Sequence, residues 1–441
     1  MNDAPIACSE AEEFFAPLAR LPRIALAVSG GPDSLALMQL VARWREARDR
    51  GPELSVLTVD HGLRPGSREE AELVGRAASA LGLHHAIVHW DKEQRPTTRL
   101  QAQARVARYD LMAAYCHAHD IPALVTAHHL DDQAETFLMR LKRGSGLDGL
   151  AAIPEEGSWA GIAILRPLLD VPKARLVATL NEAGLPFLSD PSNADPRFER
   201  ARMRQRSDAL SLLGLTPEAL ALSARRLRRA REALDEAARD FLARHSAMSE
   251  AGYATIDRSA LATVPREIAL RALSQLIAAV GGGETPVQLA KLEKLLAALE
   301  ANPDKAHTLG RCRLETFASR LGLFREVRGG GLPVARLSPG ERTLWDNRFT
   351  IELGANAPEA MTVRALGEGG LRELRERSSL ISSVPRLAGR TLPSCWHGEV
   401  LIGLPALGLA GLSEPLSLDC RARFVRSGLN EGFATNSRLN R

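Results

Sequence analysis

The N-terminal part of the chain alternates short apolar runs with longer segments of helical periodicity, and this alternation restricts the possible folds more than any other feature. The strand-like runs are 24–28, 54–59, 86–88 and 123–126. Helical periodicity begins at Ser34 and returns in 67–81, 98–119 and 131–143. Such alternation predicts a parallel, doubly wound sheet with helices on both faces. Ligands of these sheets bind beyond the carboxyl ends of the strands, which are followed here by 29–34, 60–64 and 127–132.

The first of these segments, SGGPDS at 29–34, is a glycine-rich bend between a strand and a helix. In a structural interpretation the glycines only permit positive φ, and Asp33 or Ser34 caps the helix. In a functional interpretation the bend binds an anion, because Gly30 and Gly31 expose backbone N–H groups next to a helix N-terminus. The segment has neither the lysine of a Walker A loop nor the spacing of a dinucleotide fingerprint. The bend alone is compatible with both interpretations.

Ionisable side chains gather at the other two strand ends. Asp60 and His61 follow the second strand in VDHGLRPGS, and two histidines and two aspartates follow the fourth strand in TAHHLDDQAETF. Asp132 and Glu135 are three residues apart, so they share one face of a helix. Carboxylates in this arrangement hold Mg²⁺ or an ammonium group, or else form a solvated first helical turn. Polar clusters at three strand ends of one sheet favour a binding site.

Composition excludes several classes of protein. The chain has 441 residues, of which 45% are hydrophobic and 25% charged, enough for about three globular domains. The apolar stretch 400–412 contains Pro405 and three glycines and cannot span a bilayer, and the acidic N-terminus is unlike a signal peptide. The five cysteines form no C-x-x-C pair, which argues against structural zinc or an iron–sulfur cluster. We therefore expect a cytoplasmic protein without a membrane partner.

The motifs together resemble the tRNA(Ile)-lysidine synthetase family of N-type ATP pyrophosphatases. SGGPDS is similar to the SGGxDS pyrophosphate loop, and it is followed in order by DHGLR, HHLDDQAET, RGSGLDGL, RPLL and DPSN. The loop alone indicates only the superfamily, whereas the ordered set is highly specific. The resemblance implies that ATP is cleaved between its α and β phosphates to adenylate the wobble cytidine of the CAU-anticodon tRNA(Ile). The ε-amine of free L-lysine then displaces AMP, and no obligatory protein partner is evident.

The resemblance also implies roles for individual residues. The ATP-binding residues would be Ser29, Gly30, Gly31, Pro32, Asp33, Ser34, Asp60 and His61. A Mg²⁺ ion held with help from Asp33 would neutralise the departing pyrophosphate. The catalytic residues would be Asp33, Asp132, Glu135, Arg108 and His128, of which the last four would grip and deprotonate lysine. Arg105 competes with Arg108 for the functional arginine, since either guanidinium could bind a phosphate or the lysine carboxylate.

A basic segment directly follows DPSN. Residues 197–232 contain ten arginines and four acidic residues, a net charge of +6, whereas the whole chain carries only +4. Such a run is either a solvated face or the electrostatic footprint of a nucleic acid. The arginines expected to contact tRNA are Arg197, Arg200, Arg202, Arg204 and Arg206. The family has asparagine at the position of Ala201.

We expect an α/β protein of three domains. They are an ATP-pyrophosphatase domain of the adenine nucleotide alpha hydrolase type at 1–212, a mainly helical tRNA-binding domain at 213–330, and a small α+β tRNA-binding domain at 331–441. A long helix at 216–246, further helical pattern through 266–301 and strand-like runs near 307–327 fill the middle domain. The stretch GGGLP at 329–333 is typical of a linker. LSPGERTLWDNRFTIEL and TLPSCWHGEVLIGLPALG resemble the C-terminal domain of the longer, bacterial form of the family.

Other functions explain fewer of these features. A related enzyme that thiolates a tRNA base would use the same ATP loop, but it is expected to carry paired or catalytic cysteines, and none lies at the strand ends. An amidotransferase-type ligase needs a source of ammonia, which the residues before 24 are too few to supply. A non-enzymatic RNA-binding protein would explain the arginines but not the acids and histidines. The thiolating enzyme is the main alternative.

Overall fold

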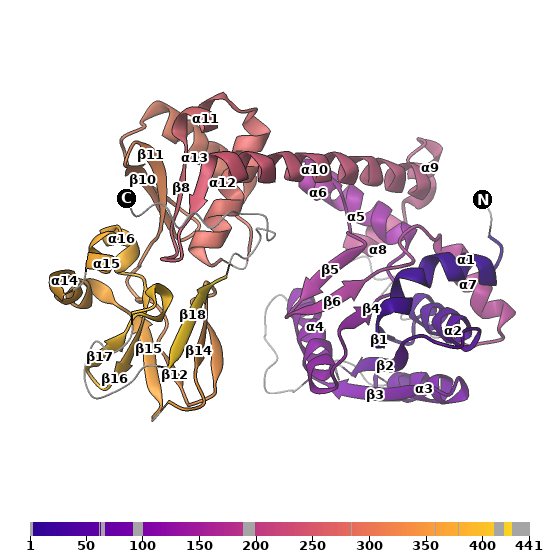
Figure 1. The fold of residues 1–441 in the computed structure, drawn as a ribbon. Coiled ribbons are helices and arrows are strands. Elements are labelled where there is room, and N and C mark those ends of the chain that lie inside the picture. Colours follow the sequence, from indigo (N-terminus) through magenta and orange to yellow (C-terminus); the bar gives the residue numbers. More distant parts are fainter. Residues whose placement is uncertain are drawn as a thin grey trace. The chain divides into compact units, whose positions relative to one another are not determined.

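The computed structural model describes residues 3–60, 62, 67–90, 100–187, 199–283, 285–357, 359–377, 379–409 and 419–425. The chain divides into two compact units, Met1–Arg231 and Glu232–Arg441, and the division falls within the long helix α10 (Pro217–His245) (Figure 1). The three-domain division expected from the sequence stays a prediction. Among the described residues, no helix has the length and apolar character needed to cross a membrane.

The N-terminal unit is built on a six-stranded sheet in the order β3-β2-β1-β4-β6-β5. The strands are β1 (Arg23–Ala27), β2 (Glu53–Asp60), β3 (His84–His89), β4 (Ala123–Val125), β5 (Glu156–Trp159) and β6 (Ile162–Leu165). All neighbours from β3 to β6 are parallel, and only the β5–β6 hairpin at the edge is antiparallel. The predicted doubly wound parallel sheet is therefore confirmed, with one antiparallel edge strand added.

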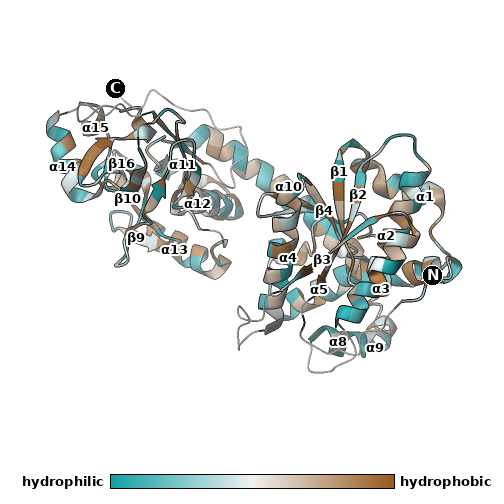
Figure 2. Ribbon diagram, turned by 90° about the horizontal axis from the view of Figure 1, so that it is seen from below, coloured by the Kyte–Doolittle hydropathy of each residue, from teal (hydrophilic) through white to brown (hydrophobic). Residues whose placement is uncertain are grey.

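Helices cover both faces of this sheet (Figure 1). The helices of this unit are α1 (Cys8–Phe15), η1 (Ala16–Arg20), α2 (Pro32–Glu46), α3 (Ser67–Ala80), α4 (Leu100–Ala118), α5 (Leu130–Lys142), α6 (Leu147–Leu150), α7 (Lys173–Glu182), α8 (Glu199–Arg204) and α9 (Ser207–Leu212). Side chains alternate across a strand, so Ile24 and Leu26 of β1 pack against α1, α2, α3 and α7, whereas Ala25 packs against α4. Strands buried on both faces read as continuous apolar runs, which is why the sequence signals them clearly (Figure 2).

The strand order reverses at β1. The chain passes from β1 to β2 on one side and later returns to β4 on the other side. The segments that leave the carboxyl ends of β1 and β4, 28–31 and 126–129, consequently lie where the chain departs in two directions from neighbouring strands. In open α/β sheets such a reversal of strand order is where ligands bind. The fold thus brings the SGGPDS bend next to the HHLDD segment.

The C-terminal unit contains helices and three smaller sheets (Figure 1). Its helices are α11 (Arg258–Thr263), α12 (Arg266–Gly281), α13 (Leu289–Ala301), α14 (Gly367–Arg377), α15 (Ser379–Ser382), α16 (Arg386–Gly389) and η4 (Pro405–Leu407). A five-stranded antiparallel sheet joins β7 (Ser246–Met248), β8 (Ala254–Ile256), β11 (Arg320–Arg325), β10 (Cys312–Phe317) and β9 (His307–Leu309). The region expected to be mainly helical therefore also holds a sheet, of which β9, β10 and β11 correspond to the expected runs.

Two further sheets complete this unit. The four-stranded sheet joins β12 (Ala335–Leu337), β15 (Met361–Ala365), β16 (Pro393–His397) and β17 (Val400–Gly403). The three-stranded sheet joins β13 (Arg342–Trp345), β14 (Phe349–Leu353) and β18 (Cys420–Phe424). Apolar residues of all three sheets and of α12 and α13 form one continuous core.

Candidate nucleotide and amine site

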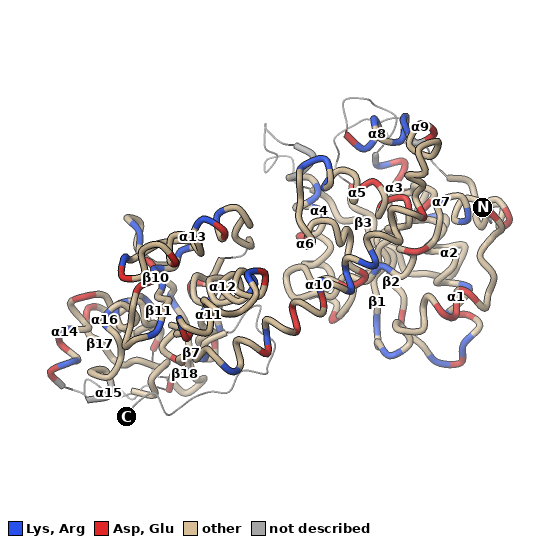
Figure 3. Tube along the Cα trace, turned by 90° about the horizontal axis from the view of Figure 1, so that it is seen from above, with Lys and Arg blue, Asp and Glu red and all other residues tan. Residues whose placement is uncertain are grey.

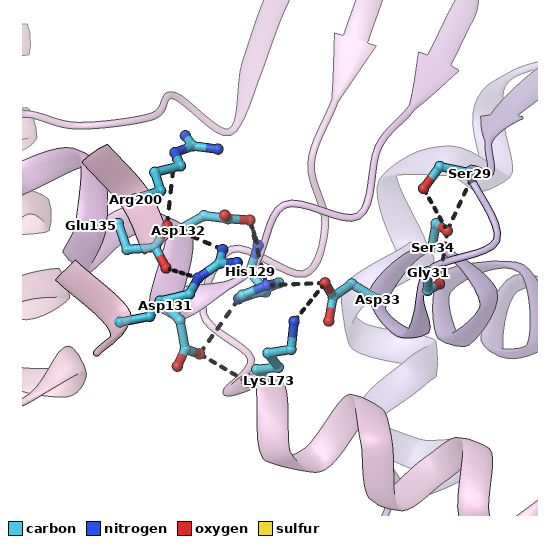
Figure 4. A network of polar contacts seen from close by, with 11 residues as sticks. Ser29, Gly31, Asp33, Ser34, His129, Asp131, Asp132, Glu135, Lys173 and Arg200 are labelled. Carbon is cyan, nitrogen blue, oxygen red and sulfur yellow. Dashed lines mark hydrogen bonds and ion pairs between the residues drawn. The ribbon is translucent and has the colours of Figure 1, made fainter. Parts of the chain in front are cut away.

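The SGGPDS bend forms a preorganised loop between β1 and α2. Gly30 has a φ of +87°, a conformation that favours glycine, whereas Gly31 lies in the ordinary extended region directly before Pro32. The backbone N–H of Ser29 donates to Ser34 Oγ at 3.1 Å, and Ser34 Oγ donates to the carbonyl of Gly31 at 2.9 Å (Figure 4). The Ser34 hydroxyl proton is therefore used in a hydrogen bond within the loop, whereas the Ser29 side chain is exposed to solvent.

A buried histidine that sequence reasoning passed over organises the end of β4. His129 is 2% exposed and precedes α5. Its ring nitrogens lie 3.5 Å from Asp33, 3.4 Å from Asp131 and 3.6 Å from Asp132, each measured to a carboxylate oxygen. Burial lowers the pKa of His129, but its hydrogen bonds to the carboxylates of Asp131 and Asp33 and the charges of Asp132 and Asp33 outweigh burial and raise the pKa to about 10. A cationic imidazolium thus joins the pyrophosphate-loop residue to the acids of α5.

Lys173, at the start of α7, is the second cation of this network (Figure 4). Its Nζ lies 3.1 Å from Asp33 Oδ2, and its backbone N–H donates to Asp131 Oδ2 at 2.9 Å. Burial opposes ionisation of Asp33, but His129 and Lys173 together hold its pKa below the ordinary value. Lys173 and Asp33 are 140 residues apart in the chain, so no local sequence signal could have revealed this pair.

Asp33 also has an oxygen without a partner. Its Oδ1 is buried and accepts no hydrogen bond from the described residues, although Oδ2 contacts both His129 and Lys173. A buried carboxylate oxygen left in this state suits a hard cation. No group of three or more His, Cys, Asp or Glu side chains among the described residues could hold a metal ion. A Mg²⁺ ion bound by one carboxylate and by substrate phosphates matches this arrangement.

Glu135 on α5 meets two arginines of the basic segment. Arg204 Nε lies 2.5 Å from Oε1 and its Nη2 3.2 Å from Oε2, while Arg200 Nε is 3.7 Å from Oε2. Burial, to 8% exposure, raises the pKa of Glu135, and the charge of Asp132 adds to that rise against the opposing effect of Arg204. The carboxylate predicted to hold a lysine ammonium is thus occupied by a guanidinium that was predicted to bind tRNA.

His128 differs from its neighbour because it is neutral. Burial, together with the positive charges of Arg166, Arg105 and Arg200, lowers its pKa to about 4 against the opposing effect of Asp132. Its Nδ1 lies 2.8 Å from the hydroxyl of Thr126. Arg105 and Arg108 both have exposed side chains on α4, and the guanidinium of Arg105 lies over the ring of Tyr109 at 5.4 Å. Of the two arginines, Arg105 is the one whose charge lowers the pKa of His128.

The remaining predicted site residues fall into two groups. His61 and Arg197 lie outside the described residues, as does the DPSN segment. Asp60 ends β2, accepts from the backbone N–H of Gly62 at 2.8 Å and lies 3.5 Å from His89.

The basic segment is only partly available for a nucleic acid. Figure 3 shows Lys and Arg positions along α8. Arg202 on α8 and Arg206 just after it are exposed. Further along the segment, Arg225 pairs with Asp170 at 2.7 Å and the buried Arg228 with Glu155 at 2.8 Å. Part of the positive charge therefore stabilises the fold.

The loop, the reversal of strand order and the acid cluster together define a PP-loop protein, a class that uses ATP. The PP-loop domain family matches residues 5–207, and this range contains every element of the network described above. The U34-tRNA thiolase NcsA from Methanococcus maripaludis has a similar solved structure, with a TM-score of 0.42 and 18% identity over 49% of this chain and 76% of that chain.

Curated relatives narrow the class to one family. The tRNA(Ile)-lysidine synthase of Bradyrhizobium sp. (strain BTAi1 / ATCC BAA-1182) is 47% identical over 305 residues, which are 67% of this chain and 84% of the relative. The tRNA(Ile)-lysidine synthase of Ruegeria pomeroyi is 37% identical over 393 residues, which are 88% of this chain and 89% of the relative. The chain belongs to the tRNA(Ile)-lysidine synthase family and is an enzyme.

Proposed function

We propose that this protein ligates free L-lysine to the wobble cytidine of the CAU-anticodon tRNA(Ile), with ATP cleaved to AMP and pyrophosphate. The observation that carries the proposal is the polar network that runs from the loop residue Asp33 through His129 to the acids of α5 (Figure 4). Such a network provides a phosphate-binding loop and amine-binding carboxylates in one crevice. The two halves of a ligation through an adenylated base need both.

The first half of the reaction adenylates the cytidine and releases pyrophosphate. Developing charge on the leaving group is stabilised by the backbone N–H groups of Gly30 and Gly31, by the N-terminus of α2 and by the ammonium of Lys173. Asp33, with its unpartnered Oδ1, would hold a Mg²⁺ ion, which supplies further neutralisation of the phosphates. Lys173 would thus supply the positive charge that a Walker A loop obtains from its own lysine.

The second half attacks the activated carbon with the lysine ε-amine. Asp132 and Glu135 supply the negative charge that recognises the ammonium group, and the neutral His128 can accept a hydrogen bond from it. Because Arg204 now forms a bidentate pair with Glu135, lysine binds there only when this guanidinium moves away. Arg105 and Arg108 remain candidates for the lysine carboxylate.

The proposed function also predicts how the enzyme binds tRNA and where in the cell it acts. Arg200, Arg202, Arg204 and Arg206 would contact the RNA backbone close to the crevice, and the C-terminal unit would bind another part of the tRNA. The enzyme would act in the cytoplasm without an obligatory protein partner. The thiolating alternative is less supported, because the relatives are named lysidine synthases and no cysteine lies in 29–34, 60–64 or 127–132.

The test is a ligation assay with purified protein, ATP, Mg²⁺ and a CAU-anticodon tRNA transcript. We expect pyrophosphate release with the transcript, and lysidine in the RNA only when lysine is added. A transcript with a UAU anticodon is the matched control and should give neither product. Lysine-independent incorporation of sulfur, or no pyrophosphate release with any tRNA, would contradict the proposal.

A further inference from the structure

Two cysteines of the C-terminal unit lie sulfur to sulfur. Cys395 Sγ donates to Cys420 Sγ at 3.4 Å, although 25 residues separate them in the chain. Both are free thiols. Disulfide geometry requires about 2.05 Å between the sulfur atoms, so closure of the pair asks for an approach of about 1.4 Å. Small rotations of the Cys395 and Cys420 side chains about χ1 can bring the sulfur atoms this much closer.

The two thiols belong to different sheets. Cys395 is on β16, opposite Val363 of β15, in the four-stranded sheet, whereas Cys420 begins β18, opposite Leu353 of β14, in the three-stranded sheet. Within the part of the chain that the structure describes, no hydrogen-bonded ladder connects these sheets directly. They are held together by the apolar core that contains Cys395 and against which Cys420 packs. A bond between the sulfur atoms would join the sheets covalently.

The two cysteines differ in access to solvent. Cys395 is fully buried, and Cys420 is half-buried. The hydrogen bond from Cys395 lowers the pKa of Cys420, while the same contact and burial raise the pKa of Cys395. Thiolate character and exposure decide which sulfur an oxidant attacks first. Cys420 therefore meets an oxidant first, and Cys395 is positioned to resolve the product.

Metal binding is a weaker explanation of the pair. Among the described residues no group of three or more His, Cys, Asp or Glu side chains could hold a metal ion. Two sulfur atoms in contact and without a further ligand match the chemistry of thiol oxidation better than that of a metal centre.

We propose that Cys395 and Cys420 form a reversible disulfide when the enzyme meets a peroxide. The Cys420 thiolate attacks one peroxide oxygen, so that an S–O bond forms, the O–O bond breaks and water leaves after protonation. Cys395 then attacks the Cys420 sulfur, the S–O bond breaks, and the proton of Cys395 leaves with the hydroxide as a second water. One peroxide is reduced by two thiols, and a thiol reductant restores the pair.

The experiment treats the full-length enzyme with hydrogen peroxide, alkylates the remaining thiols and maps disulfides by peptide mass spectrometry. We expect a linked peptide pair that contains Cys395 and Cys420 and disappears on reduction, while Cys116 and Cys312 stay alkylatable after unfolding. The thermal midpoint of the oxidised enzyme should rise by roughly 5 °C, because the cross-link restricts the unfolded chain. Reduction should reverse the shift.

Two variants and one control complete the test. Cys395→Ser and Cys420→Ser should each abolish both the linked peptide and the reducible shift of the midpoint. Cys8→Ser, which removes the exposed thiol near the N-terminus, should leave both unchanged. The proposal is overturned if peroxide converts Cys420 to a sulfinic acid while Cys395 remains free. It is also overturned if the linked peptides join other cysteines.

Discussion

The protein contains two buried charge clusters that differ in how well their atoms are satisfied. In the N-terminal unit, Asp33 leaves one oxygen without a partner and Lys173 is 38% exposed. In the C-terminal unit, Asp346 accepts from Arg325 at 2.9 and 2.7 Å and from Arg348 at 2.6 Å. Arg348 is completely buried, and its remaining nitrogens reach backbone carbonyls of Thr391 and Gly252. The first cluster is incomplete without a ligand, whereas the second is complete by itself.

This difference distinguishes a charge cluster that binds a ligand from one that only stabilises the fold. A buried polar network with every atom paired fixes one local structure. A network with an unpaired buried oxygen and a solvent-exposed cation can still bind a ligand through these groups. Charge alone does not distinguish the two, since both contain acidic and basic groups in contact.

The largest expected effect comes from the incomplete cluster. Asp33→Ala should reduce lysidine formation by roughly 10³- to 10⁴-fold, about 4–5.5 kcal/mol, because it removes the carboxylate proposed to act at the metal and phosphates. Thermal unfolding and tRNA affinity should change little. The assay is single-turnover lysidine formation, with Asp170→Ala, a half-exposed carboxylate outside the network, as control. Unchanged turnover would refute the pyrophosphate-loop assignment.

The complete cluster should show the opposite pattern. Asp346→Asn leaves two buried guanidinium groups without their shared counter-charge and should lower the free energy of unfolding by about 3–5 kcal/mol. Denaturant unfolding followed by fluorescence of the buried Trp345 measures this loss. At a temperature where the variant is folded, pyrophosphate release should stay near the wild-type rate. A stable variant would show that the cluster is not a structural element.

The stabilising role of Asp346 should also appear in the pH dependence of the free energy of unfolding. Arg325 and Arg348 hold the pKa of Asp346 below its ordinary value despite burial. Its stabilising contribution is therefore fully present above the unfolded pKa, about 4, and is lost as pH falls through the lower folded pKa. The free energy of unfolding of the wild type should fall more steeply in this window than that of Asp346→Asn. Parallel pH profiles would contradict the assignment.

A smaller effect should separate lysine use from adenylation. Glu135→Gln removes one charge from a partly desolvated pair and should cost about 2–3 kcal/mol, roughly 30- to 150-fold, in the lysine-dependent step. Pyrophosphate release should suffer far less, and a lysine titration should show a raised lysine requirement. Glu155→Gln is the matched control, because Glu155 is also paired with an arginine but lies outside the network. If both half-reactions fall together, Glu135 acts at the metal instead.

The smallest effect concerns the exposed arginines. Arg202→Ala together with Arg206→Ala should weaken tRNA binding and flatten the slope of log K against log salt by about 0.7–0.9 for each lost phosphate contact. Arg226→Ala with Arg229→Ala removes an exposed pair farther along the basic segment and serves as the control. It tests whether tRNA binding depends on the position of the arginines or only on the total charge. An unaltered slope in the Arg202→Ala, Arg206→Ala variant would show that these arginines only face solvent and do not contact phosphate.

Local patterns carried much of the information about the N-terminal unit. The apolar runs at 24–28 and 123–126 and the glycine-rich bend gave strands β1 and β4 and the loop before α2, since each depends on neighbouring residues. The order of motifs also indicated the family. In the C-terminal unit, antiparallel strands such as β7 and β8 are only three residues long, and runs this short have no distinctive periodicity.

The sequence by itself determined the class of fold, the loop and the acids of α5, because hydrophobic period and turn chemistry act over a few residues. Only the tertiary structure decided that Lys173 meets Asp33, that Arg204 covers Glu135 and that His129 is cationic. These properties arise when parallel strands with long crossovers bring distant segments to one end of the sheet and partly bury their side chains there. Burial and charge at that point depend on all the neighbours at once, so no stretch of sequence contains them.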